Sequence, residues 1–210
     1  MYSPQVLITD GNDVVLRLLD KNKAFLSRNK AYLNQTTTAT TTNSTSTTNN
    51  STIIDGLIVK ELIWGNLTSI ENALSELQGS PQIIMGADVI LWPNYTKPLL
   101  VTIKYLLSLS QSHSHSLPPT EESVCYISYV ERATSVTELF FKLCAELCLE
   151  VKEIDASLFL PQDCSDNLKL VHKHLYQLKL ATNNTACSFN TPFDISEFTW
   201  EQEETQDSPF

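Results

Sequence analysis

Glycine is scarce in this sequence and is never closely spaced. Only 5 of the 210 residues are glycine, and no two of them form a G-x-G pair. Loops that hold phosphate groups depend on such pairs, because a backbone without Cβ atoms lets the ligand reach the amide groups. The sequence therefore contains no glycine-rich loop of the dinucleotide-binding kind.

Basic residues and long apolar runs are also lacking. Lysine and arginine together number 14 against 24 aspartates and glutamates, which gives a formal net charge of −10. An acidic chain repels phosphate backbones and anionic lipid surfaces, so we expect no direct binding to nucleic acid. No run reaches the roughly 18 apolar residues of a membrane helix, and no segment has the pattern of a signal peptide. These absences predict a cytoplasmic protein without a membrane partner.

The cysteines lack the spacing of a metal site or of a disulfide framework. Five cysteines are present, an odd number, and none of them forms a C-x-x-C pair. Zinc ribbons need such pairs, and small disulfide frameworks need an even count. We therefore expect free thiols in a reducing compartment and no bound metal.

Composition separates one predicted domain from two polar segments. Residues 34–52 are almost entirely Thr, Asn and Ser, so they lack the apolar side chains that offset the entropy of ordering a segment. We interpret them as a disordered insertion in a surface loop. Residues 182–210 are interpreted as an acidic tail, and residues 1–181 are long enough to bury the core of one domain.

Hydrophobic periodicity predicts that strands and helices alternate. Apolar runs bounded by turn residues favour strands, and apolar residues spaced three and four apart favour helices. Ser135 and Glu138 have the spacing of a capping box at the last helix, and the final two strands are typical of a pair that closes a sheet antiparallel. The order predicts an α/β fold with helices on both faces of the sheet. The predicted strands are 6–10, 56–65, 82–93, 124–130, 149–154 and 173–180, and the predicted helices are 14–26, 69–78, 96–110 and 135–148.

Two acidic residues lie where predicted strands end. The stretch VLITDGND places Asp10 at the end of one strand, and GADVILWP places Asp88 near the carboxyl end of another. An acid at such a place commonly accepts hydrogen bonds from a ribose, which makes Asp10 a candidate nucleotide ligand. The alternatives are that Asp10 caps the following helix and that Asp88 caps a turn. A dinucleotide fold is a further alternative, but it requires the missing glycine loop.

Four stretches occur together in a familiar order. They are VLITDGNDVVLRLLDKN, ELIWGN, GADVILWPNYTKPLLVTIKYLL and CYISYVERATSVTELFF. In this order they resemble the class I S-adenosylmethionine-dependent methyltransferases, specifically the methyltransferase-16 family of protein-lysine methyltransferases, over roughly residues 5 to 180. The resemblance implies a Rossmann-like sheet, S-adenosylmethionine as cofactor and a protein substrate.

The resemblance also implies roles for individual residues. Asp10 would hold the ribose hydroxyls of the cofactor, and Trp64 would lie near its adenine. Ala87 would lie against the cofactor, and Asp88 would be the catalytic acid that positions the acceptor amine beside the methyl group. A place for Trp64 in the core is the alternative.

The sequence departs from the family pattern in two places. The family usually has Asp-x-x-Tyr, whereas this chain has Leu91 at the last position, so Trp92 or Tyr95 would have to replace the aromatic side chain. Only five residues precede the family's second strand here, so its first strand, glycine-rich loop and first helix are not in this sequence. That first strand lies between the second and fourth strands of the family's sheet. We therefore expect exposed strand edges and weak or no cofactor binding.

Two functions remain open from the sequence. The first is a methyltransferase, complete or partial, that modifies protein lysine. The second is a catalytically inactive, methyltransferase-like binding module that acts through a protein partner. The sequence does not predict an oligomeric state.

Overall fold

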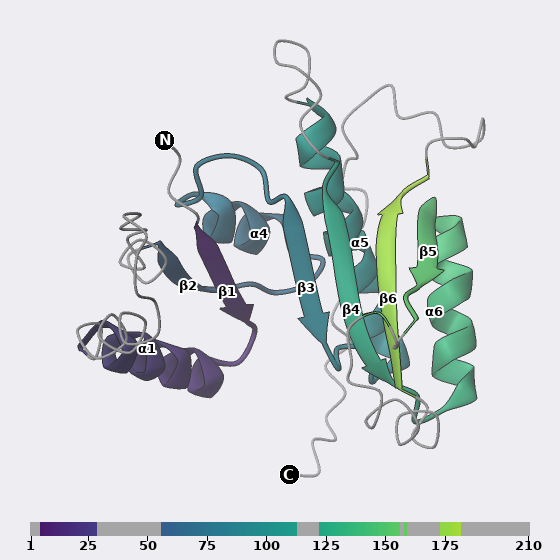
Figure 1. The fold of residues 1–210 in the computed structure, drawn as a ribbon, viewed down its shortest axis with the longest axis horizontal. Coiled ribbons are helices and arrows are strands. Elements are labelled where there is room, and N and C mark those ends of the chain that lie inside the picture. The colour runs from purple at the N-terminus through teal and green to yellow at the C-terminus, as the bar shows by residue number, and fades with distance from the viewer. Residues whose placement is uncertain (1–4, 29–55, 113–121, 156–157, 159–172, 182–210) are drawn as a thin grey trace, which may run out of the picture. The chain divides into compact units, whose positions relative to one another are not determined.

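The structure is a computed structural model that describes residues 5–28, 56–112, 122–155, 158 and 173–181 (Figure 1). The predicted insertion at 34–52 and the predicted tail at 182–210 lie outside the described residues. The chain divides into two compact units, residues 1–78 and 79–210, and each is described by itself. None of the described helices is long and apolar enough to cross a membrane.

The described elements have the predicted order, with strands and helices in alternation and two strands at the end. The first unit contains β1 (Val6–Asp10), α1 (Asp13–Arg28), β2 (Leu57–Glu61) and α4 (Leu67–Leu74). The second unit contains β3 (Ile83–Ala87), α5 (Pro93–Ser112), β4 (Val124–Val130), α6 (Thr134–Glu146), β5 (Leu149–Glu153) and β6 (Lys173–Leu180). The fold is therefore a mixed α/β fold.

The first unit is built on two parallel strands. β1 and β2 pair in register from Val6 opposite Leu57 to Asp10 opposite Glu61, so the carboxyl ends of both strands lie at one edge. Both strands are rich in apolar, β-branched residues, which favour extended backbone. Among the described residues of this unit, the buried side chains come from the segment after β2, and they are Leu62, Ile70 and Ala73.

Helix α1 leaves apolar side chains in water. It contacts β1 and β2, yet none of its residues is buried. The exposed fractions of Val14, Leu18 and Phe25 are 73%, 56% and 61%. A fully buried side chain of this kind contributes about 1.5–3 kcal/mol, so α1 forgoes most of that stabilisation.

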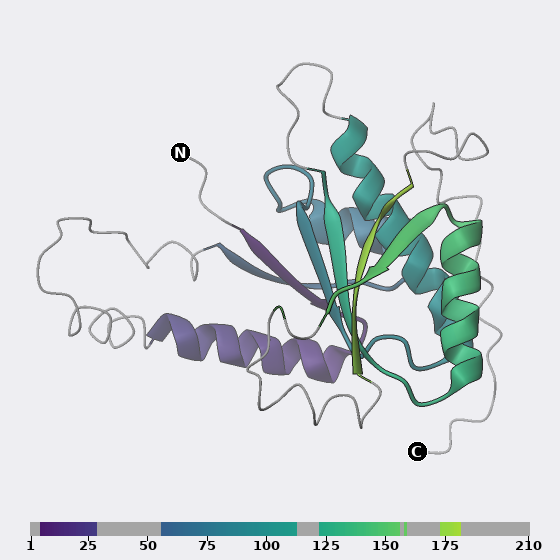
Figure 2. The same ribbon diagram turned by 45° about the vertical axis from the view of Figure 1, so that its right-hand side comes forward.

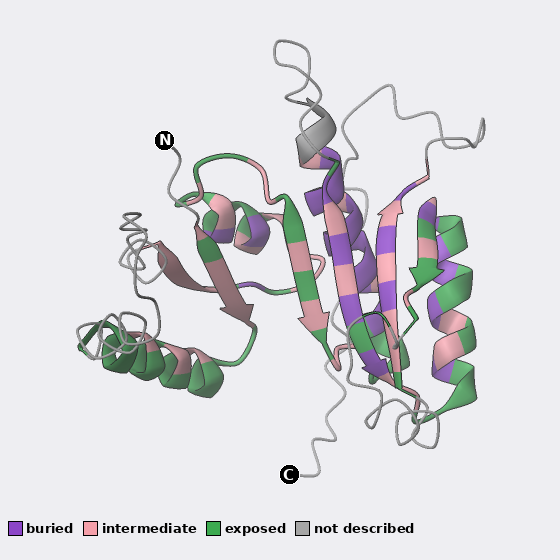
Figure 3. Ribbon diagram, in the orientation of Figure 1, coloured by how far each residue is buried: buried purple, intermediate pink, exposed green. Residues whose placement is uncertain are grey.

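The second unit contains a four-stranded sheet in the order β3-β4-β6-β5. β3 is parallel to β4, and β6 is inserted antiparallel between β4 and β5, which confirms the predicted closing pair. Alternate residues of β4 and β6 form the buried face, with Ile127 opposite Tyr176 and Cys125 opposite Leu178 (Figure 3). The ring of Phe140, from α6, stacks on Tyr176 over this face at 5.7 Å between centroids.

The helices α5 and α6 contact each other and lie against this buried face, with α6 running along β5 (Figure 2). The sequence predicted helices on both faces of the sheet, whereas the described helices of this unit share one face. The opposite face is half-buried and partly polar, and there the amide of Gln177 donates to the hydroxyl oxygen of Tyr126 at 3.1 Å.

The ends of several elements differ from the prediction for local reasons. β3 stops at Ala87 because Asp88 adopts a φ of 54°, which turns the chain out of the sheet. α5 starts at Pro93, three residues early, because proline suits the first position of a helix. The capping box predicted for Ser135 and Glu138 is wrong: α6 begins at Thr134, and its N-cap makes no side-chain hydrogen bond.

The rates of amide hydrogen exchange should differ between the two sheets. The amides of Ile8 and Val59 should exchange at least about tenfold faster than those of Ile127 and Leu178, because a two-stranded sheet with few buried side chains opens more readily than a covered four-stranded one. Exchange followed residue by residue by NMR measures this difference. Equal protection of the two strand pairs would contradict it.

Candidate functional site

Asp10 ends β1 and has one carboxylate oxygen available. Its Oδ1 accepts a hydrogen bond from the backbone N–H of Asn12 at 2.8 Å. Its Oδ2 has no hydrogen-bond partner among the described residues. Asn12 is the residue that caps α1, because its side chain accepts from the N–H groups of Val14 and Val15 at 2.9 and 3.4 Å. Asp10 therefore does not cap the helix and retains acceptor capacity for a ligand.

Trp64 lies in a tight turn after β2. The N–H of Asn66 donates to the carbonyl of Ile63 at 3.2 Å, which places Trp64 and Gly65 at the two central positions of the turn. Gly65 has a φ of 77°, a conformation that favours glycine at this position. Asn66 then caps α4 by accepting from the N–H of Ser69 at 2.9 Å. The indole is half-buried, so Trp64 is not a core residue.

Asp10 and Trp64 belong to the same edge of the first unit. The N–H of Leu62 donates to the carbonyl of Asp10 at 3.1 Å, so the chain leaving β2 passes the end of β1. Glu61 is opposite Asp10 in the register and adds a second, exposed carboxylate there. Sequence reasoning missed Glu61, although an acid at the end of a second parallel strand was the available signal.

Ala87 and Asp88 lie at the carboxyl end of β3 in the second unit. Ala87 is exposed and is opposite Ser128 of β4. The N–H of Asp88 donates to the carbonyl of Ser128 at 2.8 Å, so the backbone of Asp88 still belongs to the strand ladder while its φ of 54° is left-handed. Aspartate tolerates this region better than most residues do.

The carboxylate of Asp88 is bound by Arg132. The guanidinium donates from Nη1 to Oδ1 at 2.8 Å and from Nη2 to Oδ2 at 2.6 Å, which is a bidentate ion pair. Arg132 follows β4, and the carboxyl ends of parallel neighbours meet at one edge of a sheet. Sequence reasoning missed Arg132, because its role depends on which strand pairs with β3.

The Arg132 hydrogen bonds hold the pKa of Asp88 below its usual value, against a smaller opposing effect of desolvation, and the same pair raises the pKa of Arg132. Both side chains remain accessible, with 42% of Asp88 and 55% of Arg132 exposed. Asp88 is therefore a charged acceptor at neutral pH that is already occupied by a cation.

Aromatic side chains follow Asp88 along the chain. Leu91, at the position where the family has tyrosine, is 39% exposed, whereas Trp92 and Tyr95 are 65% and 56% exposed. The N–H of Tyr95 donates to the carbonyl of Trp92 at 3.1 Å, which fixes both residues at the start of α5. Exposed aromatic rings are residue types that can bind an organic cation, and these two follow the acid in the chain.

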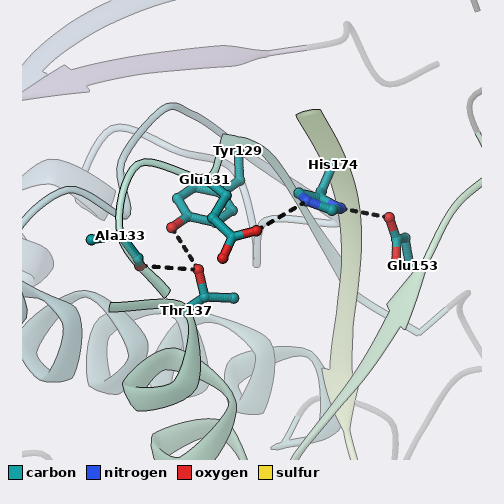
Figure 4. A network of polar contacts seen from close by, with 6 residues as sticks. All are labelled: Tyr129, Glu131, Ala133, Thr137, Glu153 and His174. Atoms are coloured by element: carbon teal, nitrogen blue, oxygen red, sulfur yellow. Dashed lines mark hydrogen bonds and ion pairs between the residues drawn. The ribbon is translucent and has the colours of Figure 1, made fainter. Parts of the chain in front are cut away.

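A polar network supports the segment that carries Arg132 (Figure 4). His174 Nδ1 is 2.7 Å from Glu153 Oε1, and its Nε2 is 4.0 Å from Glu131 Oε2. The hydroxyls of Tyr129 and Thr137 are 2.9 Å apart. These contacts join β4, β5, β6 and α6 at the end of the sheet where Arg132 lies.

None of the cysteines that the structure describes is a candidate nucleophile. Burial raises the pKa of the Cys125 and Cys144 thiols to about 12, so both are neutral near pH 7. Cys148 is disulfide-bonded, which corrects the expectation that all the cysteines are free thiols. Among the described residues, no group of three or more His, Cys, Asp or Glu side chains is placed to hold a metal ion.

The predicted site residues thus fall in two sets. Asp10 and Trp64 share an edge of the first unit, and Ala87 and Asp88 share an edge of the second. No family model matches this chain, and no curated protein matches it significantly.

Replacing Arg132 with glutamine should raise the pKa of Asp88 toward the usual value, because the two charged hydrogen bonds are lost. A folded-state pKa below the unfolded one stabilises the fold above the unfolded pKa, and this stabilisation is lost as the pH falls through the folded pKa. Exposure of the pair keeps the effect small. A carboxyl carbon NMR titration of Asp88 measures the shift. An unchanged pKa in Arg132→Gln would contradict the ion pair, and Arg17→Gln is the matched control.

Two substitutions of Asp88 should separate the effect of backbone conformation on stability from the effect of charge. Asp88→Val should lower the free energy of unfolding by about 1–3 kcal/mol, because a β-branched residue is strained at a left-handed φ. Asp88→Asn tolerates this φ and should lower the free energy of unfolding much less than Asp88→Val does, because only an exposed ion pair is lost. Urea unfolding gives both values, and equal losses in the two variants would refute the backbone argument.

Proposed function

We propose that this chain carries the ribose-binding and acceptor-binding parts of a class I S-adenosylmethionine-dependent methyltransferase that modifies lysine in a cytoplasmic protein. The observation that carries the proposal is the edge of the first unit. There the Oδ2 of Asp10 has no hydrogen-bond partner among the described residues, and a half-buried Trp64 lies in the turn after β2. Both residues come from the motifs that resemble the methyltransferase-16 family.

The first unit fits the adenosine end of the cofactor. A ribose offers hydroxyl donors, and the Oδ2 of Asp10 is an acceptor without a partner among the described residues. An indole that is only half-buried can pack on a purine ring. When bound, S-adenosylmethionine would supply an activated methyl group, and the residues of the chain would orient it.

The strand pairing supports a Rossmann-like methyltransferase sheet. The family's first strand lies between its second and fourth strands, which correspond to β1 and β3. Among the described residues, β1 pairs on one side only, with β2, and β3 pairs on one side only, with β4. The exposed fractions of Ile83 and Met85 on β3 are 63% and 81%. Each of these two strands therefore has an edge at which a further strand could pair.

The second unit fits the acceptor. A lysine ammonium needs an anionic acceptor, which the carboxylate of Asp88 provides, and aromatic faces that favour a cation, which Trp92 and Tyr95 provide. Alignment of the amine and exclusion of water are the main demands of methyl transfer to nitrogen. Asp88 would position the amine while it loses its proton.

A binding module is the second candidate function, and two observations favour it. Leu91 replaces the aromatic residue of the family, and Arg132 already neutralises Asp88. A partner that adds a strand along the free edge of β3 would cover Ile83 and Met85. Such a module would bind a protein without transferring a methyl group.

Titration with S-adenosylmethionine tests the proposed enzyme. We expect weak, saturable shifts of the Asp10 and Trp64 backbone amide signals in NMR spectra, and loss of these shifts in Asp10→Asn. Asp13→Asn is the matched control, because Asp13 is an exposed carboxylate of the same unit that pairs with Arg17. If millimolar cofactor shifts neither signal in the folded chain, this polypeptide is not a methyltransferase and the binding module is favoured.

A further inference from the structure

Arg132 contacts Asp88 in a way that ordinary strand packing does not require. The β3–β4 pair is already joined by its backbone ladder, which continues to the N–H of Asp88. Among the described residues, Asp88 is the only side chain that hydrogen-bonds to Arg132. The ion pair is therefore an additional contact at the carboxyl ends of two strands that their backbone hydrogen bonds already join.

The backbone on both sides of Arg132 is fixed while its side chain is exposed. The carboxylate of Glu131 contacts the ring of His174, and the carbonyl of Ala133 accepts from Oγ1 of Thr137 at 3.4 Å (Figure 4). The same carbonyl accepts from the N–H of Val136 at 3.1 Å. The guanidinium is thus delivered to Asp88 by a supported segment, yet 55% of the side chain remains in contact with solvent.

An ion pair this exposed can be replaced by another cation. The exposed fraction of the Asp88 side chain is 42%, so water and salt screen its attraction to Arg132. A primary ammonium has three donors and can take over the carboxylate oxygens that the guanidinium occupies. The guanidinium occupies one acceptor position on each oxygen and repels a second cation that approaches, so the two cations compete for Asp88.

We propose that Arg132 is an exchangeable counter-ion of Asp88, which the ammonium group of the acceptor must displace before it can bind. The identity of that ammonium as a substrate lysine rests on the function proposed above, whereas the exchange itself does not. Arg132 is then a positioning residue that keeps the carboxylate ionised and oriented. It also lowers the apparent affinity of Asp88 for other cations, because these can bind only during the fraction of time in which Arg132 is not bound to the carboxylate.

The exchange is testable without cofactor or methyl transfer. n-Butylammonium serves as the probe, and its binding is followed through the side-chain carboxyl carbon of Asp88 by NMR. Arg132→Gln should bind the probe about two- to fivefold more tightly than the wild type, the range expected for an exposed ion pair. Arg132→Lys keeps a cation at this position but lacks the planar fork that forms a bidentate pair. The affinity of this variant for the probe should therefore lie between the affinities of the wild type and of Arg132→Gln. Asp88→Asn, followed at its backbone amide, should show no saturable shift.

The controls distinguish this proposal from a structural role and from the proposed enzyme. Arg17→Gln removes an equally charged, exposed arginine that pairs with Asp13, and it should leave probe affinity unchanged. The proposal is overturned if folded Arg132→Gln or Arg132→Lys binds the probe no more tightly than the wild type, or if Asp88→Asn binds it equally well. A negative cofactor titration together with tighter probe binding in Arg132→Gln would refute the methyltransferase and retain the exchange.

Discussion

The parallel pairing of β3 with β4 is the constraint on which the second unit and its candidate site depend. It brings the carboxyl ends of both strands to one edge, so that Asp88 and Arg132 meet although 44 residues separate them in sequence. The pairing is fixed from the other side by β6, whose Tyr176 and Leu178 face Ile127 and Cys125 in the buried layer under α6. The core thus sets the register, and the register sets the position of the charges.

The described part of the first unit has a parallel strand pair as well, but few buried side chains hold it in place. Its two strands are half-buried, α1 contributes no buried side chain, and apolar side chains of that helix are exposed. The geometry that Asp10 and Trp64 require is instead provided locally, by an Asx hydrogen bond to Asn12 and by the glycine turn at Gly65. Local hydrogen bonds can shape a ligand site, but they do not replace a core as a source of stability.

The order of the elements was predictable from the sequence, because apolar periodicity differs clearly between strands and helices. The end of β3 was not predictable, because the apolar run continues to Ile90. This residue lies after the strand and is buried, with 1% of it exposed. Asp88 and Asp10 were predictable as acids at strand ends. Arg132 was harder to predict, because its importance depends on which strand lies beside β3, and that pairing is decided by tertiary packing rather than by local sequence.

The environment of Asp88 explains why an acid at a strand end is ambiguous evidence for function. A buried, bidentate pair with arginine would be structural, because its separation would leave an uncompensated charge in a low-dielectric interior and cost about 3–5 kcal/mol. The same pair at the surface contributes little to stability, because water screens the two charges, and an incoming cation can offset its loss. With 42% of Asp88 and 55% of Arg132 exposed, the Asp88–Arg132 pair is a surface ion pair. Accessibility, more than geometry, therefore leaves Asp88 available to a ligand even though its two oxygens are already bound.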